Sequence, residues 1–389
     1  MSLILPFTFF SSVNPNPPVV LGTAIFKIIT TDVSSPYPDS NFIFGGISSI
    51  NNISLTGIGL LDKFDEVDIN FRPNLTNSAF SVRSAVISSG NAGDFKFIIG
   101  GNFNISGVPN TNRIAILNLS AIGGNLITSF TTTPPLGDVY GLIITDRVYA
   151  VGVFDLPRKN IIAYDFNGTS STTFRWGLNS YARCIKSDSS GNIFVGGAFT
   201  TVTKVGVANY SRRGIAKINT SGSGTISTTF NPSKVLNTTG LIVNDIEITS
   251  IGDIIVASTN AGSNKALIRL PPETPDTAYE SFDVWTGVIV YDCLAIKIDN
   301  NGKLLAGLRT INGFRLYRFN MLGSISLDTT FGSGDGYVSI VNSSGSNVFI
   351  TISVDSQNNI ILGGDFTSID GNIRNKFAVL DNNGAVLNR

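Results

Sequence analysis

A short phrase recurs along the whole sequence: an apolar strand that ends in a glycine doublet, followed by a small residue and phenylalanine. Three clear copies and four degenerate ones lie at Phe97–Phe103, Ile193–Phe199, Ile360–Phe366, Phe42–Gly46, Tyr149–Phe154, Ile254–Ser258 and Leu304–Gly307. The second glycine, or the residue in its place, stands at positions 46, 101, 152, 197, 258, 307 and 364, a period of about 53 residues. A repeat of this length built from strands predicts a seven-bladed β-propeller.

The composition favours an all-β chain. Charged residues make up only 14% of it, basic and acidic residues balance at 27 each, and Asn, Ser, Thr and Gly dominate the polar residues. This mixture disfavours long helices and favours strands joined by tight turns. Because one repeat covers nearly the whole chain, we predict a single domain over residues 1–389. Its units are expected at about 20–71, 78–130, 137–174, 180–230, 241–282, 290–331 and 345–389.

The last unit shows how one blade is built. Val348–Val354 alternates apolar and polar residues and is predicted as the innermost strand. Asn359–Phe366 is the second strand, whose glycines permit a bulge or a close backbone approach. Lys376–Leu380 is the third strand, Asp381–Gly384 is a hairpin turn, and a fourth strand begins at Ala385–Leu387. We therefore predict four antiparallel strands in each blade.

The fourth strand of most units ends in phenylalanine. These residues are Phe71, Phe130, Phe174, Phe230, Phe282 and Phe331. We interpret them as core residues between blades. A seventh phenylalanine is missing because the chain stops at Arg389, whereas Phe7 and Phe9 lie near the other end. We therefore predict that residues 3 to 9 form a strand that completes the last blade and closes the ring.

The phrase Ser326–Gly332, the glycine doublet with its phenylalanine, and the following Ala-x-Leu-Asn-x-x-Gly pattern together resemble the delta-60 repeat of bacterial and viral β-propellers. Two units depart from it, with Val151 in place of the first glycine in one and Ala257-Ser258 in place of the doublet in the other. The resemblance implies a propeller fold and a surface or virion setting. It implies no catalytic residue.

Several classes of function and location are disfavoured. A neutral chain without a basic run lacks the electrostatic footprint of a nucleic-acid binder. No apolar run has the length of a membrane span, and Met1–Phe10 lacks a basic region and contains Pro6, so we expect neither membrane insertion nor a cleaved leader. Cys184 and Cys293 fall in equivalent segments of non-adjacent units, so we expect buried, unlinked thiols.

The residues offer little catalytic chemistry. The chain has no histidine, which removes Ser-His-Asp and Cys-His arrangements and histidine-dependent metal sites. We predict no catalytic, cofactor or metal site and no bound cofactor. Four polar residues of the innermost strands could converge on the central channel, and they are Lys186, Glu247, Lys297 and Ser353. Mutually paired or solvated charges are the expected outcome there.

The leading hypothesis is a non-enzymatic structural or attachment protein of a phage or virus, such as a capsid decoration, tail or fibre-associated module. Its location would be the virion, and its partners other virion structural proteins or a host-surface receptor or glycan. Contacts would use the longer loops, expected at Asp32–Asn41, Ser88–Lys96, Leu156–Lys159, Val202–Ser211 and Pro271–Tyr279.

Two alternatives remain open. A carbohydrate-binding, extracellular or cell-surface adhesin would stack sugars on one of Tyr181, Tyr210, Tyr279, Trp176 or Trp285. A propeller glycosidase or lyase would use carboxylates of the channel.

Overall fold

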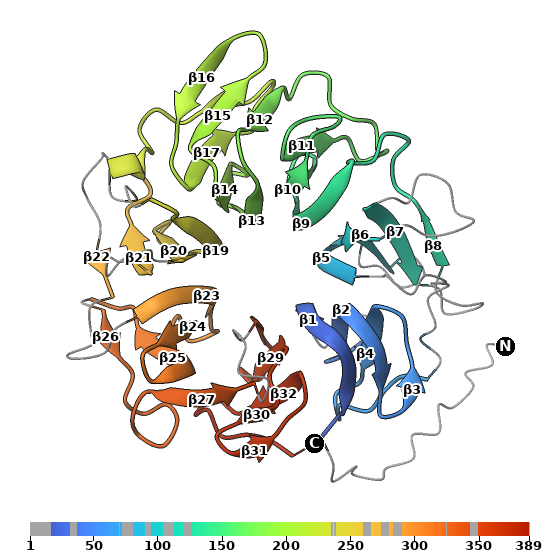
Figure 1. Ribbon diagram of the computed structural model, residues 1–389, viewed down its shortest axis with the longest axis vertical. Helices are drawn as coiled ribbons and strands as arrows, with labels where there is room; N and C mark the ends of the chain where they lie inside the picture. The colour runs from blue at the N-terminus through green and yellow to red at the C-terminus, as the bar shows by residue number, and fades with distance from the viewer. Residues whose placement is uncertain are drawn as a thin grey trace, which may run out of the picture.

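The computed structural model describes residues 17–31, 37–69, 71, 81–89, 95–103, 113–119, 126–234, 236, 239–259, 266–273, 280–282, 290–323, 325–342 and 349–388. Strands dominate these residues, and one short 3-10 turn lies at Pro232–Lys234. Small twisted sheets surround a central opening in a β-propeller-like arrangement (Figure 1). The all-β prediction is confirmed. None of the helices in the described part of the chain has the length and apolar character needed to cross a bilayer.

The innermost strands surround the opening and run in chain order. They are β1 (Val20–Thr30), β5 (Ser81–Ser89), β9 (Gly137–Ile144), β13 (Ala182–Ser187), β19 (Ile242–Ile248), β23 (Val290–Ile298) and β28 (Ile350–Val354). Each contacts the next, and β28 contacts β1, so the contacts between inner strands form a closed circle (Figure 1).

Each inner strand pairs antiparallel with a second strand that carries the recurring phrase. These are β2 (Asn41–Ile50), β6 (Phe95–Asn102), β10 (Val148–Phe154), β14 (Ile193–Gly197), β20 (Ile254–Thr259), β24 (Leu304–Thr310) and β29 (Ile360–Gly364). The third strands are β4 (Ile58–Leu61), β7 (Ile114–Leu119), β11 (Ile161–Tyr164), β17 (Ile215–Asn219), β21 (Leu267–Leu270), β25 (Gly313–Asn320) and β32 (Phe377–Leu380).

The fourth strands are shorter than the sequence predicts. Where present, they are β8 (Leu126–Ser129), β18 (Thr225–Ile226), β22 (Glu280–Ser281) and β26 (Ser326–Leu327). In the other units the described residues show only an isolated bridge, at Leu61–Val67, Tyr164–Ser170 and Leu380–Val386. Among the described residues a fourth strand is therefore present in only part of the ring, and it is short.

Additional strands lie outside the ring of inner, second and third strands. β12 (Trp176–Leu178), β15 (Thr201–Lys204) and β16 (Ala208–Ser211) form a separate sheet at its edge (Figure 1). The expectation of a loop at Val202–Ser211 is therefore wrong, because β15 and β16 pair as a hairpin around Val205–Val207. The remaining short strands are β3 (Ile53–Ser54), β27 (Tyr337–Val341), β30 (Ser368–Ile369) and β31 (Asn372–Ile373).

In β6 and β14 the glycine doublet lies opposite a β-bulge of the inner strand, whereas in β29 Gly363 and Gly364 pair with Thr351 and Ile350 without a skip. Opposite the doublet, β13 skips one residue, because Ala182 pairs with Gly197 and Cys184 pairs with Gly196. A Cβ on Gly197 would lie 2.6 Å from the Cα atom of Ala182, inside backbone contact. Neither glycine has a positive φ, so the requirement is close approach of two backbones.

The first glycine of the doublet makes room for the neighbouring sheet. A Cβ on Gly100 would lie 2.6 Å from the Cγ1 atom of Val139, and one on Gly363 would lie 2.6 Å from the Cγ2 atom of Ile25. In the repeat of β24 the strand pairing differs from the one that the sequence spacing indicates. Gly307 pairs with Ala295 and so takes the place of the first glycine, and the place of the second glycine falls one residue later.

Apolar clusters lie between neighbouring sheets all around the ring. Each predicted phenylalanine is buried in a different cluster, in the order Phe71, Phe130, Phe174, Phe230, Phe282 and Phe331. Their prediction as core residues between blades is confirmed. The cluster that joins the last sheet to the first contains Ile25, Ile28 and Phe377, with Leu387 packed against it, and has none of these phenylalanines. The predicted closing strand of residues 3 to 9 lies outside the described residues.

One buried ion pair strengthens the sheet of β25. Arg318 and Asp328 are almost fully buried, and the Nε atom of Arg318 donates to the Oδ2 atom of Asp328 at 2.6 Å. Lys303 and Thr330 also donate to this carboxylate, at 2.7 Å each. Although desolvation alone would raise it, these hydrogen bonds hold the pKa of Asp328 well below its usual range.

Both cysteines behave as expected from their positions. Cys184 in β13 and Cys293 in β23 are buried and unlinked. Burial, and then the nearby Asp245 carboxylate, raise the pKa of both thiols well above the usual value. The prediction of buried, unlinked thiols is confirmed.

Candidate functional site

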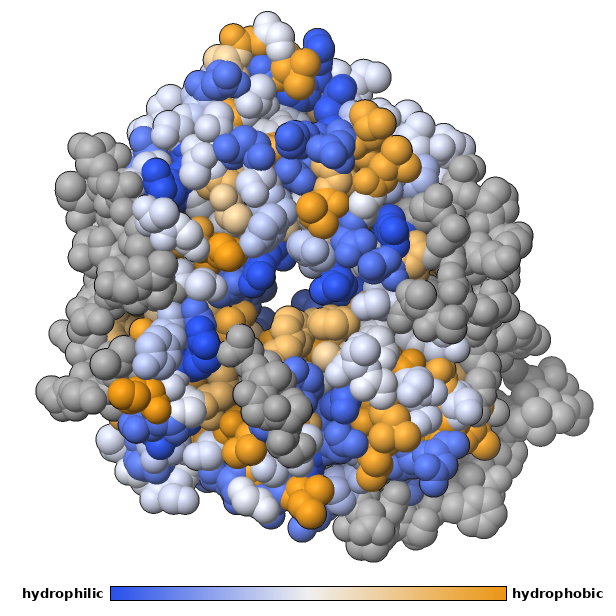
Figure 2. Space-filling model, in the orientation of Figure 1, coloured by the Kyte–Doolittle hydropathy of each residue, from blue (hydrophilic) through white to orange (hydrophobic). Residues whose placement is uncertain are grey.

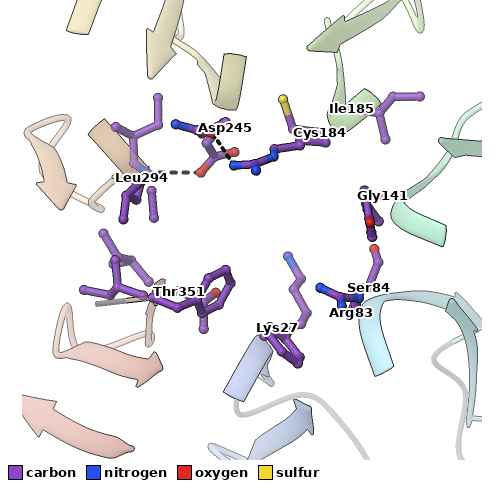
Figure 3. A pocket seen from close by; sticks show the side chains of 18 of the residues that line it. Lys27, Arg83, Ser84, Gly141, Cys184, Ile185, Asp245, Leu294 and Thr351 are labelled. Atoms are coloured by element: carbon purple, nitrogen blue, oxygen red, sulfur yellow. Dashed lines mark hydrogen bonds between the residues drawn. The ribbon is translucent and has the colours of Figure 1, made fainter. Parts of the chain in front are cut away.

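The inner strands enclose a cavity of about 710 Å³ on the axis of the ring. The space-filling view shows an opening there, with hydrophilic residues on much of its wall (Figure 2). The cavity draws residues from every inner strand named above, so its composition depends on the closure of the whole ring (Figure 3).

The inner-strand bulges supply one group of lining residues. In six of the sheets the register skips one residue, and that extra residue lines the cavity: Phe26, Arg83, Tyr140, Arg183, Asn244 and Leu294. A bulged residue leaves the ladder and can be turned away from the sheet. In β6 and β14 the glycine doublet lies opposite such a bulge, so there it helps to position a side chain of the cavity wall in addition to packing the blades.

Arg83 is held between two aromatic rings from the neighbouring inner strands. Its guanidinium carbon lies 4.9 Å from the ring centroid of Phe26 and 5.0 Å from that of Tyr140. Phe26 in turn makes an edge contact with Phe349 at 5.0 Å between centroids. The Nε atom of Arg83 is buried, and no described residue accepts a hydrogen bond from it. The rings thus hold the guanidinium in place, while its Nε atom has no hydrogen-bond acceptor among the described residues.

Lys27 extends into the cavity from β1 (Figure 3). Among the described residues, its ammonium group has neither an ion-pair nor a hydrogen-bond partner. Desolvation, and then the positive charge of Lys186, lower the pKa of Lys27 to about 8, and Lys297 acts in the same direction. The carboxylates of Asp245 and Glu247 oppose this shift without cancelling it. The surroundings of Lys27 are therefore unfavourable to its own positive charge.

A second group of charges is mutually paired. The Nζ atom of Lys186 lies 2.8 Å from the Oε1 atom of Glu247, and the Nζ atom of Lys297 lies 3.6 Å from the same oxygen. Desolvation would raise the pKa of Glu247, but the two lysines outweigh it and the pKa is lowered. Glu247 is thus an ionised carboxylate shared by two cations.

The other carboxylate of the cavity joins two inner strands. Asp245 accepts hydrogen bonds from the backbone nitrogens of Ile246 at 2.9 Å and Ile296 at 3.1 Å. Ser84 acts similarly across another boundary, accepting from the nitrogen of Leu142 at 3.0 Å. Desolvation raises the pKa of Asp245 despite the hydrogen bonds that it accepts from Ile246 and Ile296. Its geometry is that of a structural link between sheets.

The neighbouring bulge side chains are also linked. The Nη1 atom of Arg183 donates to the Oδ1 atom of Asn244 at 2.6 Å, and the Nδ2 atom of Asn244 donates to the carbonyl of Cys293 at 2.8 Å. Arg183 is exposed and lies 5.8 Å from the ring centroid of Tyr181. It has no ion pair with a described carboxylate, so its charge remains available at the cavity wall.

The predicted convergence of Lys186, Glu247, Lys297 and Ser353 on the channel agrees with the structure, because all four line the cavity. Three of them form the paired charges described above. The fourth, Ser353, exchanges a hydrogen bond with the Thr30 hydroxyl at 3.0 Å. Sequence reasoning missed Lys27, Arg83 and Arg183. The only local signal for Arg83 and Arg183 was their place opposite a glycine doublet, which indicates a bulge but not the direction of a side chain. Lys27 pairs with Phe44 beside the bulge at Phe26.

The aromatic residues predicted as candidates for sugar stacking lie in different environments. Trp176 is buried, and Tyr210 packs against it with 5.8 Å between ring centroids. Tyr181 lines the central cavity. Tyr279 and Trp285 lie outside the described residues. The described residues contain no group of three or more His, Cys, Asp or Glu side chains arranged to hold a metal ion.

Fold and site together define a β-propeller-like protein with a central cavity whose charged lining residues are predominantly cationic. No family model matches the sequence, and no curated protein matches it. Solved structures do match its fold. The extracellular domain of a one component system from B. thetaiotaomicron has a TM-score of 0.51 and 16% identity, over 90% of this chain and 39% of that one. Puromycin hydrolase has a TM-score of 0.51 and 10% identity, over 92% of this chain and 51% of that one.

A WD40 β-propeller domain, that of Doa1, is similar with a TM-score of 0.49 and 13% identity, over 88% of this chain and 90% of that one. The chain thus spans about two fifths to one half of the first two structures and most of the third. One of these three structures, puromycin hydrolase, is named as an enzyme. At such low identities the likeness shows the fold alone.

Proposed function

We propose that the protein is a seven-bladed β-propeller of the delta-60 type that serves as a non-enzymatic structural or attachment module of a virion. Support for the blade count comes from the circle of inner strands and from the apolar clusters between neighbouring sheets. A ring in which every sheet is held by two neighbours is rigid, and its outer edge can carry contacts without disturbing the core.

The observation that carries the attachment role is the outer sheet of β12, β15 and β16. Within the described residues β16 pairs only with β15, so its other edge is open for strand addition. The turn of this hairpin presents two valines, and Val207 is 69% exposed while Val205 is 41% exposed. The partner in this proposal is another virion structural protein, which would pair with β16 and cover both valines.

The arrangement of the cavity supports a role without catalysis. Glu247 is held ionised by two lysines, which makes it a poor general acid. Asp245 uses both carboxylate oxygens to accept backbone amides. The chain also has no histidine. A glycosidase or lyase would need one of these carboxylates to exchange its present partners for substrate.

Attachment is tested with the paired substitutions Val205→Ser and Val207→Ser, which alter the hairpin turn and leave the buried Val202 in place. Virions assembled with this variant should carry much less of the protein than wild type. The matched control is Leu322→Ser, an exposed apolar residue on another turn, which should copurify normally. Equal copurification of all three proteins would remove the hairpin from the attachment surface. Failure of the wild-type protein to copurify with virions would refute the virion role itself.

A glycan-binding adhesin is the second candidate, and Tyr181 is the observation that favours it. This ring lines the cavity beside the exposed Arg183, which is a suitable pairing for a sugar. A glycan array on the purified protein distinguishes the two functions. Binding to a defined glycan that is lost in Tyr181→Ala would favour the adhesin, and turnover of any glycan that is lost in Glu247→Gln would favour an enzyme.

A further inference from the structure

The charges that line the central cavity do not balance, although those of the whole chain do. Among the described residues, five cationic side chains and two carboxylates line the cavity: Lys27, Arg83, Arg183, Lys186 and Lys297 against Asp245 and Glu247. Over the full sequence, basic and acidic residues are equal at 27 each. A neutral protein has therefore concentrated an excess of three positive charges in one cavity of about 710 Å³.

Both carboxylates are already engaged. Glu247 is shared by Lys186 and Lys297, and the oxygens of Asp245 accept backbone amides. The remaining cations, Lys27, Arg83 and Arg183, have no carboxylate partner among the described residues. They come from three different inner strands, β1, β5 and β13, and all face the same space.

These unpaired cations are held in place. Phe26 and Tyr140 bracket the guanidinium of Arg83, and Asn244 accepts a hydrogen bond from Arg183 at 2.6 Å. No described residue accepts a hydrogen bond from the Nε atom of Arg83, and a guanidinium held in this way is preorganised to bind carboxylate or phosphate oxygens. Desolvation of Lys27 and of the Nε atom of Arg83 without a partner is unfavourable, and a bound anion would remove that cost.

We infer that the central cavity is a binding site for a small, multiply charged organic anion, which Lys27, Arg83 and Arg183 would bind. Carboxylate and phosphate groups share the required chemistry, since both offer several acceptor oxygens to arginine. Aromatic side chains of the wall would pack against the uncharged part of the ligand. This site lies on the ring axis, apart from the outer sheet of β12, β15 and β16, so it is independent of the proposed attachment surface.

The ionisation of Lys27 provides a specific consequence. Its pKa is about 8 in the free protein, under the influence of Lys186, Lys297, Asp245 and Glu247. A bound anion favours the charged ammonium and raises this pKa. Anion binding should therefore be strongest below about pH 8, weaken as the pH rises through that value, and take up a proton when it occurs near it.

The experiment is isothermal titration calorimetry at low ionic strength with citrate and, separately, inorganic phosphate. At least one of them should bind, with an affinity that falls as salt is added. Arg83→Gln and Arg183→Gln should each weaken binding by about tenfold or more, since each removes a charged hydrogen-bond donor. The control Arg175→Gln, which removes an exposed arginine outside the cavity, should bind as wild type.

Folding of the variants is checked by their melting temperature. Because Arg183 is exposed, its replacement keeps the test valid even if Arg83→Gln fails to fold. The Lys27→Gln variant should bind more weakly and lose the proton uptake, whereas Lys159→Gln, at an exposed position, should change neither. If only citrate binds, the site recognises carboxylate groups, and if only inorganic phosphate binds, it recognises phosphate groups. No binding of either probe, or equal binding by wild type and Arg183→Gln, would overturn the inference.

Discussion

Replacing Gly197 with alanine tests the link between the glycine doublet and the inner-strand bulge. A Cβ at this position would lie 2.6 Å from the Cα atom of Ala182 and would also meet the carbonyl of Tyr181. Both are backbone atoms beside the bulge at Arg183, so no rotation of a side chain can relieve the overlap. The strands must separate, or the bulge must shift.

The size of the effect can be worked out. Overpacking typically costs about 1 to 3 kcal/mol, and a clash with rigid backbone belongs at the upper end, about 3 kcal/mol. An unfolding entropy of about 2.1 cal/mol/K per residue, taken over the 389 residues, amounts to about 0.8 kcal/mol/K. If the ring unfolds as one unit, Gly197→Ala should lower the melting temperature by about 4 °C.

Differential scanning calorimetry measures this shift, and Gly177→Ala is the matched control. Gly177 also lies in a strand, but a Cβ there would be 3.5 Å from its nearest neighbour, the carbonyl oxygen of Lys159, which is ordinary contact. Its φ is not positive, so alanine should be neutral or stabilise the protein by up to about 1 kcal/mol. Equal melting temperatures for the two variants would refute close backbone approach as the reason for the doublet.

Four further predictions concern stability and burial. Asp328→Asn should lower the free energy of unfolding by about 3 to 5 kcal/mol, since it leaves Arg318 buried without its charge partner, and urea titration measures the loss. In the wild type, the lowered pKa of Asp328 contributes stability above the unfolded-state pKa of about 4, so melting temperatures should fall as the pH drops below that value. Cys184 and Cys293 should resist alkylation until denaturant is added, and rapid labelling in buffer would contradict their burial. Deleting Met1–Phe10 should lower the melting temperature by several degrees if these residues close the ring, whereas an unchanged melting curve would reject the closure.

The repeat and its core were accessible from the sequence. The spacing of the glycine doublets located the second strands, and the phenylalanines that follow the third strands, from Phe71 to Phe331, were correctly assigned to the core. Such features are local, because the alternation of a strand and the chemistry of its turns are set by neighbouring residues. The hairpin of β15 and β16 was missed because its polar residues resemble a loop, and its pairing with β12 joins segments that are distant in the chain.

The candidate site was predictable only in part. Lys186, Glu247 and Lys297 occupy similar places along three inner strands, so their convergence could be inferred from the repeat. Lys27 and Arg83 gave no comparable signal. Whether a charged residue of a bulged strand faces solvent, a partner or a cavity depends on register and on the residues of the two neighbouring sheets.

The sequence by itself determined the class of fold, because a repeated pattern of strands, turns and small residues can bury its apolar faces only by placing each unit against the next. Only the tertiary structure decided which residues meet on the axis. Bulge positions follow from strand pairing, and the surplus of positive charge arises where inner strands from distant parts of the chain come together. A chain that is neutral overall thereby acquires a cationic cavity, because ring closure places Lys27, Arg83 and Arg183 around one space in which the carboxylates of the described residues have other partners.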